Sequence, residues 1–348
     1  MKRFLKLTIF LLAVLCWQNA DAQLRPEIKA LRDSIASHNI LESIALGEGG
    51  DPSIVYQYFK KLKNKATDDE LRILIKDCNA VVRGYTFLAF LHNGSNDMFP
   101  ILLEMIYDTA TVETQESCRI GEEQVGSYCL FKAGYRNSLW YLNTNQTAII
   151  DSILIFDKNI KSYQKNNLLR RLTPDKKYYT RIREIADEER NPSAIIALAR
   201  YKNENDIEII KTFFDDKENE YYAVYAAREF PDTAFYPYLV SIFERLWAND
   251  KYDYQLSHIL CQALAKYPTK QTCKLFNRIK RIKLNYKDDD DDGIFKYETW
   301  GVCMLAAFIK YPNPIFEPIK QSINFDFEDE EGKLFIEDEI QSAIDRTP

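Results

Sequence analysis

The feature that most constrains this chain is a helix ending that recurs along it. In three segments, 226–231, 263–268 and 306–312, apolar residues are followed by an aromatic residue and then by proline. Two further segments, 197–201 and 81–91, end similarly without the proline. Because proline cannot continue a helix and pushes its predecessor out of helical geometry, the pattern marks helix ends. We therefore expect helices to end near Leu91, Tyr201, Phe230, Tyr267 and Tyr311.

Two more positions keep register with these endings. An aspartate lies fourteen residues before four of them, whereas the same offset from Tyr311 gives Tyr297. An aspartate at a helix N-terminus accepts hydrogen bonds from free backbone N–H groups, so each is expected to begin a helix. These aspartates are Asp77, Asp187, Asp216 and Asp253. Four residues before each ending lies a mostly small residue that would let helices approach closely, namely Phe87, Ala197, Ala226, Ala263 and Ala307.

Amphipathic segments between the endings predict second helices. Residues 99–106, 207–214, 235–243 and 315–323 carry apolar side chains at helical spacing, and Thr67 with Glu70 forms a capping box. The low glycine content argues against an all-β chain, and strand patterns do not alternate with helical ones as in parallel α/β folds. The sequence predicts an all-α fold, an α-solenoid of about seven or eight stacked helical hairpins, because such repeats are near 40 residues long.

Within this pattern, Asp77 is followed six residues later by Arg83 inside an amphipathic helix, directly after Val82. This arrangement resembles the Asp…Val-Arg signature of HEAT repeats, the armadillo-like helical repeat family. The resemblance implies a ladder of hydrogen bonds in which the aspartate and arginine of adjacent repeats take part, here Asp77 and Arg83. It also implies a binding scaffold over residues 23–348. The arginine position holds Ser193, Tyr222 and Ile259 in later repeats.

The N-terminus has the features of a secretory signal. Lys2, Arg3 and Lys6 precede an apolar stretch over residues 7–17, which is too short to remain as a membrane-spanning helix. Ala20-Asp21-Ala22 then presents small residues where a signal peptidase cleaves. We predict a signal peptide over residues 1–22, cleavage after Ala22, and a periplasmic or secreted mature chain without a transmembrane segment. The alternative is a lipoprotein acylated at Cys16, but the preceding Leu15 is larger than that chemistry favours.

Charge narrows the class of partner. The full chain has a net charge of −6, and loss of Lys2, Arg3, Lys6 and Asp21 with the signal peptide makes it −8. A nucleic-acid-binding protein would need a basic face, so the balance argues against nucleic acid as a partner.

Cys118 and Cys129 flank a segment with two glycines, which predicts a loop between helices. An exported chain enters an oxidising compartment, where a disulfide across such a loop is permitted and would stabilise the fold by about 3 kcal/mol. We expect this disulfide, with two free thiols as the alternative.

An acidic run matches the start of a calcium loop. Asp288, Asp290 and Asp292 alternate before Gly293, as do the first ligands of such loops. The twelfth position holds Thr299 in place of the bidentate glutamate, and Glu298 comes one residue early. The expectation is therefore weak calcium binding or a solvated acidic linker, whose like charges repel and extend it. No other cofactor is expected.

Catalytic motifs are missing from the sequence. Only three histidines occur, and there is no zinc-binding His pair, nucleophile elbow or phosphate-binding glycine loop. The best interpretation is a non-enzymatic binding or scaffold protein that uses a helical-repeat surface for a protein partner. Two alternatives remain open, an inhibitor or immunity-type protein directed against a toxin, and an enzyme whose site has no sequence motif.

Overall fold

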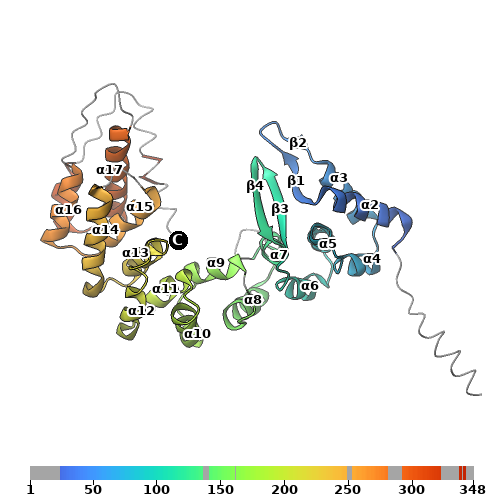
Figure 1. Ribbon diagram of the computed structural model, residues 1–348, viewed down its shortest axis with the longest axis horizontal. Coiled ribbons are helices and arrows are strands. Elements are labelled where there is room, and N and C mark those ends of the chain that lie inside the picture. Colours follow the sequence, from blue (N-terminus) through green and yellow to red (C-terminus); the bar gives the residue numbers. More distant parts are fainter. Residues whose placement is uncertain are drawn as a thin grey trace, which may run out of the picture. The chain divides into compact units, whose positions relative to one another are not determined.

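The computed structural model describes residues 24–135, 141–160, 162–248, 253–280, 292–322, 337–338 and 340–341. It divides into two compact units, Met1–Lys165 and Asn166–Pro348. Both units are mostly helical, and their elements can be followed along the chain in Figure 1.

Unit 1 combines helices with a small sheet. Its elements in chain order are α2 (Pro26–His38), β1 (Ile40–Leu46), β2 (Asp51–Pro52), α3 (Ile54–Lys65), α4 (Asp68–Leu74), α5 (Ala80–His92), α6 (Met98–Met105), β3 (Thr111–Ser117), β4 (Arg119–Gln124), α7 (Val125–Lys132) and α8 (Thr144–Phe156). The sheet order is β2-β1-β3-β4, with β1 and β3 parallel and the other pairs antiparallel. The helix α9 (Tyr163–Arg171) crosses the division between the units.

The sheet corrects the all-α prediction. The segment between Cys118 and Cys129, which was expected to be a loop between helices, contains strand β4 and the start of α7. Sequence periodicity misses these strands because β3 and β4 are mostly polar: on β3 only Val112 is a buried apolar residue, and β4 has a glycine and two glutamates. β3 pairs with β1, which lies about 70 residues earlier in the chain. A local sequence pattern cannot predict such a long-range pairing.

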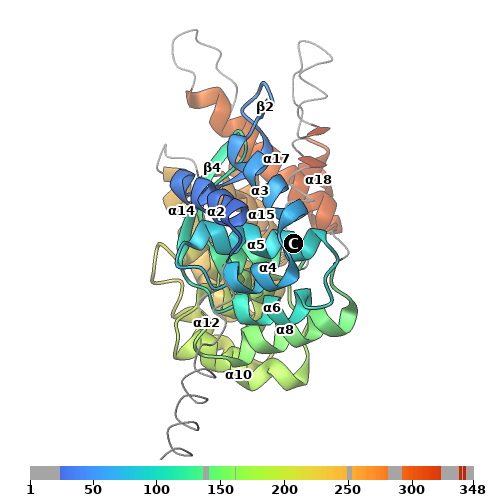
Figure 2. The ribbon, with the colours of Figure 1, turned by 90° about the vertical axis from the view of Figure 1, so that its right-hand side faces the viewer.

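Helix α5 is the centre of unit 1. Nearly every residue from Val81 to Leu91 is buried, and α5 contacts α2, α3, α4, α6 and α7; Figure 2 shows it among the neighbouring helices. The Asn79 side chain caps its N-terminus by accepting from the Val82 N–H. Phe59 of α3 stacks on Tyr85 with ring centroids 5.1 Å apart, so α5 carries the hydrophobic core of this unit.

Unit 2 repeats pairs of helices. Its described elements are α10 (Lys176–Asp187), α11 (Pro192–Ala199), η1 (Glu204–Asp206), α12 (Ile207–Lys211), α13 (Glu220–Glu229), η2 (Thr233–Phe235), α14 (Tyr236–Ala248), α15 (Tyr254–Ala265), α16 (Lys270–Lys280), α17 (Asp292–Lys310), η3 (Pro314–Phe316) and α18 (Glu317–Lys320). The first helices of successive pairs, α11, α13, α15 and α17, pack against one another in chain order.

The predicted helix ends are confirmed. Helices α5, α11, α13, α15 and α17 each end within two residues of the predicted closing residue. The residues four positions before the closing residues are all buried, none more than 2% exposed, as close helix packing requires.

The aspartate register is confirmed in full at one of its four positions, where Asp253 is the N-cap of α15. Asp77 and Asp216 lie shortly before α5 and α13 and accept the N–H groups of Asn79 and Glu218, but Asn79 and Asn219 are the N-caps. Asp187 is the last residue of α10, and Asn191 caps α11 instead. The connection between these two helices is short, which leaves the aspartate on the preceding helix.

Two of the closing tyrosines, Tyr201 and Tyr267, link successive helix pairs. The Tyr267 hydroxyl donates to the backbone oxygen of Asp232, the N-cap of η2, at 2.9 Å. The Tyr201 hydroxyl donates in the same way to Asp175, the N-cap of α10, at 2.8 Å. Each tyrosine therefore ties its own helix ending to the start of the second helix in the preceding pair.

A candidate binding sheet and the polar ladder at its base

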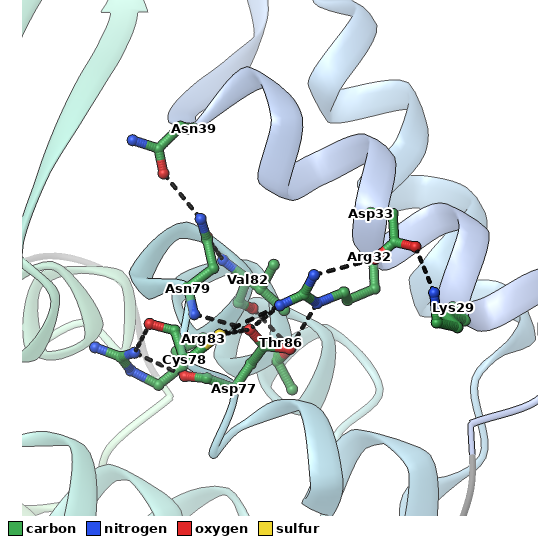
Figure 3. Close-up of polar contacts among 10 residues, drawn as sticks. All are labelled: Lys29, Arg32, Asp33, Asn39, Asp77, Cys78, Asn79, Val82, Arg83 and Thr86. Atoms are coloured by element: carbon green, nitrogen blue, oxygen red, sulfur yellow. Dashed lines mark hydrogen bonds and ion pairs between the residues drawn. The ribbon is translucent and has the colours of Figure 1, made fainter.

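A ladder of charged and polar hydrogen bonds connects α2, α5 and the start of β3. It begins where α2 meets the start of α5 (Figure 3). Arg32 of α2 donates through Nε and Nη2 to the two carboxylate oxygens of Asp77, both at 2.7 Å. Asn79 Nδ2 also donates to Asn39 Oδ1 at 2.9 Å, and Asn39 directly precedes β1. These bonds hold the end of α2, and with it the start of β1, against the N-terminus of α5.

The ladder continues from α5 to the start of β3. Arg83 donates through Nε and Nη2 to the two carboxylate oxygens of Asp108, at 2.6 and 2.9 Å. Its Nη1 donates to the backbone oxygen of Asp77 at 2.8 Å. Because Asp108 lies three residues before β3, Arg83 fixes the base of the β3–β4 hairpin.

Two backbone hydrogen bonds also join the two strands at the base of the β3–β4 hairpin. The Val125 N–H donates to Ala110 O and the Gly126 N–H to Asp108 O, which joins the end of β4 to the start of β3. Gly126 is required here by space: a Cβ on it would lie 2.6 Å from Met105 O and 2.8 Å from Ile106 O. The hairpin therefore leaves the helices from a base that backbone and charged hydrogen bonds both define.

Charge and burial act together on this ladder. Burial alone would raise the pKa of the Asp77 carboxyl, but its bonds from Arg32 and the Asn79 N–H bring that pKa below its ordinary value. The bond to Asp108 raises the pKa of Arg83 against the opposing effect of burial. Both side chains therefore stay charged at neutral pH.

The two predicted ladder residues, Asp77 and Arg83, both take part in the ladder, but their partners are more distant in the sequence than was predicted. Asp77 and Arg83 do not pair with each other through their side chains. Each pairs with a residue that the sequence analysis did not identify, Arg32 and Asp108 respectively. Arg32 lies 45 residues before Asp77 and Asp108 lies 25 residues after Arg83. The sequence signal that could have identified these partners was an arginine before the first repeat, Arg32, and an aspartate after it, Asp108.

The two faces of the sheet differ. Leu41 and Val112 are buried on the inner face, where the side chain of Leu41 lies against Gly84 of α5. On this face Lys132 of α7 pairs with Glu116. Burial, followed by the charge of Glu116, raises the pKa of the neighbouring Glu123. Carboxylates on the inner face thus have a helix and a lysine beside them.

The outer face is acidic. Strand register places Glu113 directly opposite Glu122 in one row with Ile40. The next row on the same face holds Glu42, Gln115 and Ile120. Glu113 and Glu122 are exposed, and Ile120 is 67% exposed. Among the residues that the structure describes, no ion pair includes any of these three glutamates. We define the outer face as Ile40, Glu42, Thr111, Glu113, Gln115, Ile120, Glu122 and Gln124.

The cysteine prediction is not met in the structure. Both residues are free cysteines, with Cys118 exposed in the turn between β3 and β4 and Cys129 buried in α7. Strand β4 separates them and carries Cys118 away from the helix. Burial holds the pKa of the Cys129 thiol well above its ordinary value, so this thiol stays protonated at neutral pH.

Other predicted sites fall outside the described residues. Residues 1–22, Asp288 and Asp290 are among these, and Asp292 is described only as the first residue of α17. The calcium site and the signal peptide therefore stay predictions. Within the described ranges, no group of three or more His, Cys, Asp or Glu side chains is placed to hold a metal ion. None of the helices described there combines the length and apolarity needed to cross a membrane.

No protein-family model, curated protein or solved structure matches this chain. The HEAT-like interpretation accordingly depends on the residues and contacts given above.

Proposed function

We propose that this protein is an exported binding scaffold that holds a protein partner on the outer face of its N-terminal sheet. The repeated helices would form a HEAT-like α-solenoid over the mature chain, interrupted in unit 1 by the two strand hairpins. Support for the repeat comes from the chain-order packing of α11, α13, α15 and α17 and from the equivalent Tyr201 and Tyr267 links.

The observation that carries the proposal is the unneutralised outer face on an anchored base. Directly opposed like charges destabilise a strand pair. The Glu113–Glu122 pair therefore costs stability that the described part of the chain does not recover. An exposed isoleucine beside such charges is suited to contact with a partner protein. The partner's surface would bury the isoleucine and neutralise the glutamates.

Cross-linking tests the proposed surface directly. A photoreactive benzoylphenylalanine would replace Ile120 or Thr111 on the outer face, and Asp69 of α4 would serve as an exposed control in the same unit. Irradiation of intact native cells should give the same protein adduct from Ile120 and Thr111 and none from Asp69. Adducts that are equal at all three positions, or missing from both outer-face positions, would overturn the proposal.

Export is tested separately. The mature N-terminus purified from the cell envelope should be Gln23. A chain that retains Met1, or one acylated at Cys16, contradicts the predicted cleavage after Ala22.

A further inference from the structure

We infer that the outer edge of β4 accepts a basic, extended segment of a partner protein as an added β-strand. This inference depends on the proposed function and specifies its partner.

Hairpin geometry identifies the backbone groups at this edge. Only Ser117 and Cys118 lie between the closing pair Glu116 and Arg119, so that pair exchanges backbone hydrogen bonds. Bonded pairs then alternate along the ladder, and the Val125 N–H bond to Ala110 O fits the same alternation. The N–H and C=O groups of Ile120 and Glu122, and the N–H of Gln124, consequently point away from β3, toward the open edge; the C=O of Gln124, the N-cap of α7, faces the first turn of that helix.

Within the described residues, the opposite edge of the sheet, formed by β1 and β2, is not comparably open. β2 pairs with β1 only at Ala45 and Leu46. Nearer the start of β1, the Tyr85 hydroxyl accepts from the Glu42 N–H at 2.8 Å and donates to Glu42 O at 3.1 Å. The backbone groups of Glu42 are therefore already bonded. Among the residues that the structure describes, β4 is thus the long unpaired edge of this sheet.

Charge selects the added strand. The three residues with outward backbone groups, Ile120, Glu122 and Gln124, also have their side chains on the outer face. A lysine or arginine of an incoming strand, placed opposite Glu122, would lie beside that carboxylate, with Glu113 one strand further in. An acidic strand would be repelled. A second copy of β4 would bring its own Glu122 and Glu123 to this edge, so the same charges oppose self-association.

Defined peptides test this inference on the full chain. The probe is an acetylated and amidated octapeptide in which lysine alternates with valine, measured by fluorescence anisotropy at low and at physiological salt. It should bind and weaken with salt. The same peptide with glutamate for lysine, and an N-methylated lysine peptide that cannot donate at the edge, should each bind at least tenfold more weakly.

One substitution removes an edge donor without changing charge. Gln124 has φ −71° and ψ 137°, which proline adopts without strain, and its N–H points outward. Gln124→Pro should bind the lysine peptide about fivefold or more weakly than Gln124→Ala, which loses the same side chain but keeps the backbone donor. Glu122→Lys should weaken it at least tenfold. Circular dichroism checks that each variant retains its fold.

Several results would overturn strand addition. These are equal binding of the methylated and unmethylated lysine peptides, equal affinities of Gln124→Pro and Gln124→Ala, and no binding of the lysine peptide at millimolar concentration. If cross-linking from Ile120 and Thr111 persists while these tests fail, the proposed function stands and the basic-strand inference alone is wrong.

Discussion

The two units join neighbouring helical segments by different chemistry. In unit 1 the joints are two-bond arginine–aspartate pairs, Arg32 with Asp77 and Arg83 with Asp108. In unit 2 the joint that repeats is neutral, a tyrosine hydroxyl that donates to the backbone of an N-cap aspartate. Unit 2 also has charged contacts between its helical segments, among them Arg200–Glu229 at 3.2 Å, Arg183–Asp206 at 3.1 Å and Arg278–Glu244 at 2.5 Å, but these do not recur at equivalent positions of the helix pairs. The two arginine–aspartate pairs of unit 1 lie where strands leave the helices.

Each strand hairpin of unit 1 lies between two helices that contact each other. β1 and β2 lie between α2 and α3, and β3 and β4 lie between α6 and α7. The hairpins therefore occupy the place of the short turn that connects paired helices in unit 2. A turn needs only a cap, whereas a projecting hairpin needs a fixed base, and the arginine–aspartate ladder provides it.

The largest expected effect is steric. Gly126→Ala should destabilise unit 1 by about 3 kcal/mol, because the added methyl meets two backbone oxygens that cannot move aside. Denaturant unfolding measures the loss. Hydrogen exchange should show faster exchange in β3 and β4 with little change in α11 to α15.

Gly121→Ala is the matched control, since the nearest atom to its added methyl would be Thr114 Oγ1 at 3.9 Å. Equal losses from the two substitutions would remove the argument that the hairpin base is fixed by close approach at Gly126.

The second effect concerns charge. Arg83→Met leaves the mostly buried Asp108 carboxylate without its arginine, and should cost about 2 kcal/mol after allowance for partial exposure. The double variant Arg83→Met/Asp108→Asn should recover part of this loss, since no charge is left unpaired. Strictly additive losses in the thermodynamic cycle would show that the pair does not act as a joint.

The third prediction is a pH dependence of unit 1. Glu70 accepts from Arg25 and from the Thr67 N–H in the predicted capping box, and the Arg25 bond leads in lowering its pKa from 4.5 to about 2. Because the folded-state pKa is lowered, this stability is present above pH 4.5 and is lost as pH falls toward 2.

Glu70→Gln should therefore cost about 1.5 kcal/mol at pH 7, a figure that allows for the half-exposed Arg25, and the difference from the parent should shrink by pH 3. Thermal melts at pH 7, 5 and 3 follow this convergence. A difference that stays constant over the three pH values would mean that the charge of Glu70 does not contribute.

Sequence patterns predicted the helices of unit 2 better than the sheet of unit 1. Helix ends such as Phe230 and Tyr267 are set by local residues, an aromatic followed by proline, and these were found. The strands depend on β1 pairing with β3 across the chain, and Asp108 became part of the ladder only through that fold. The HEAT-like spacing identified Asp77 and Arg83 but not Arg32 and Asp108. These partners lie 45 and 25 residues away, and no periodic sequence pattern connects them. The outer face was missed because only the pairing of β3 with β4 brings Glu113 opposite Glu122, and the sequence analysis did not predict these strands.

The smallest expected effect probes the neutral joint of unit 2. Tyr267→Phe removes the hydroxyl bond to Asp232 O and should cost about 1 kcal/mol, since that oxygen keeps its bond from the Phe235 N–H. Burial raises the pKa of Tyr267, so the hydroxyl remains a neutral donor, and the cost should be the same at pH 5 and pH 8. Chemical denaturation at both pH values measures it, with Tyr238→Phe, an intermediate-burial tyrosine of α14 that stacks on Phe214, as a matched loss of one hydroxyl. If the two substitutions cost the same, the closing tyrosine is only a packing residue, and the contrast between charged joints in unit 1 and neutral joints in unit 2 loses its neutral half.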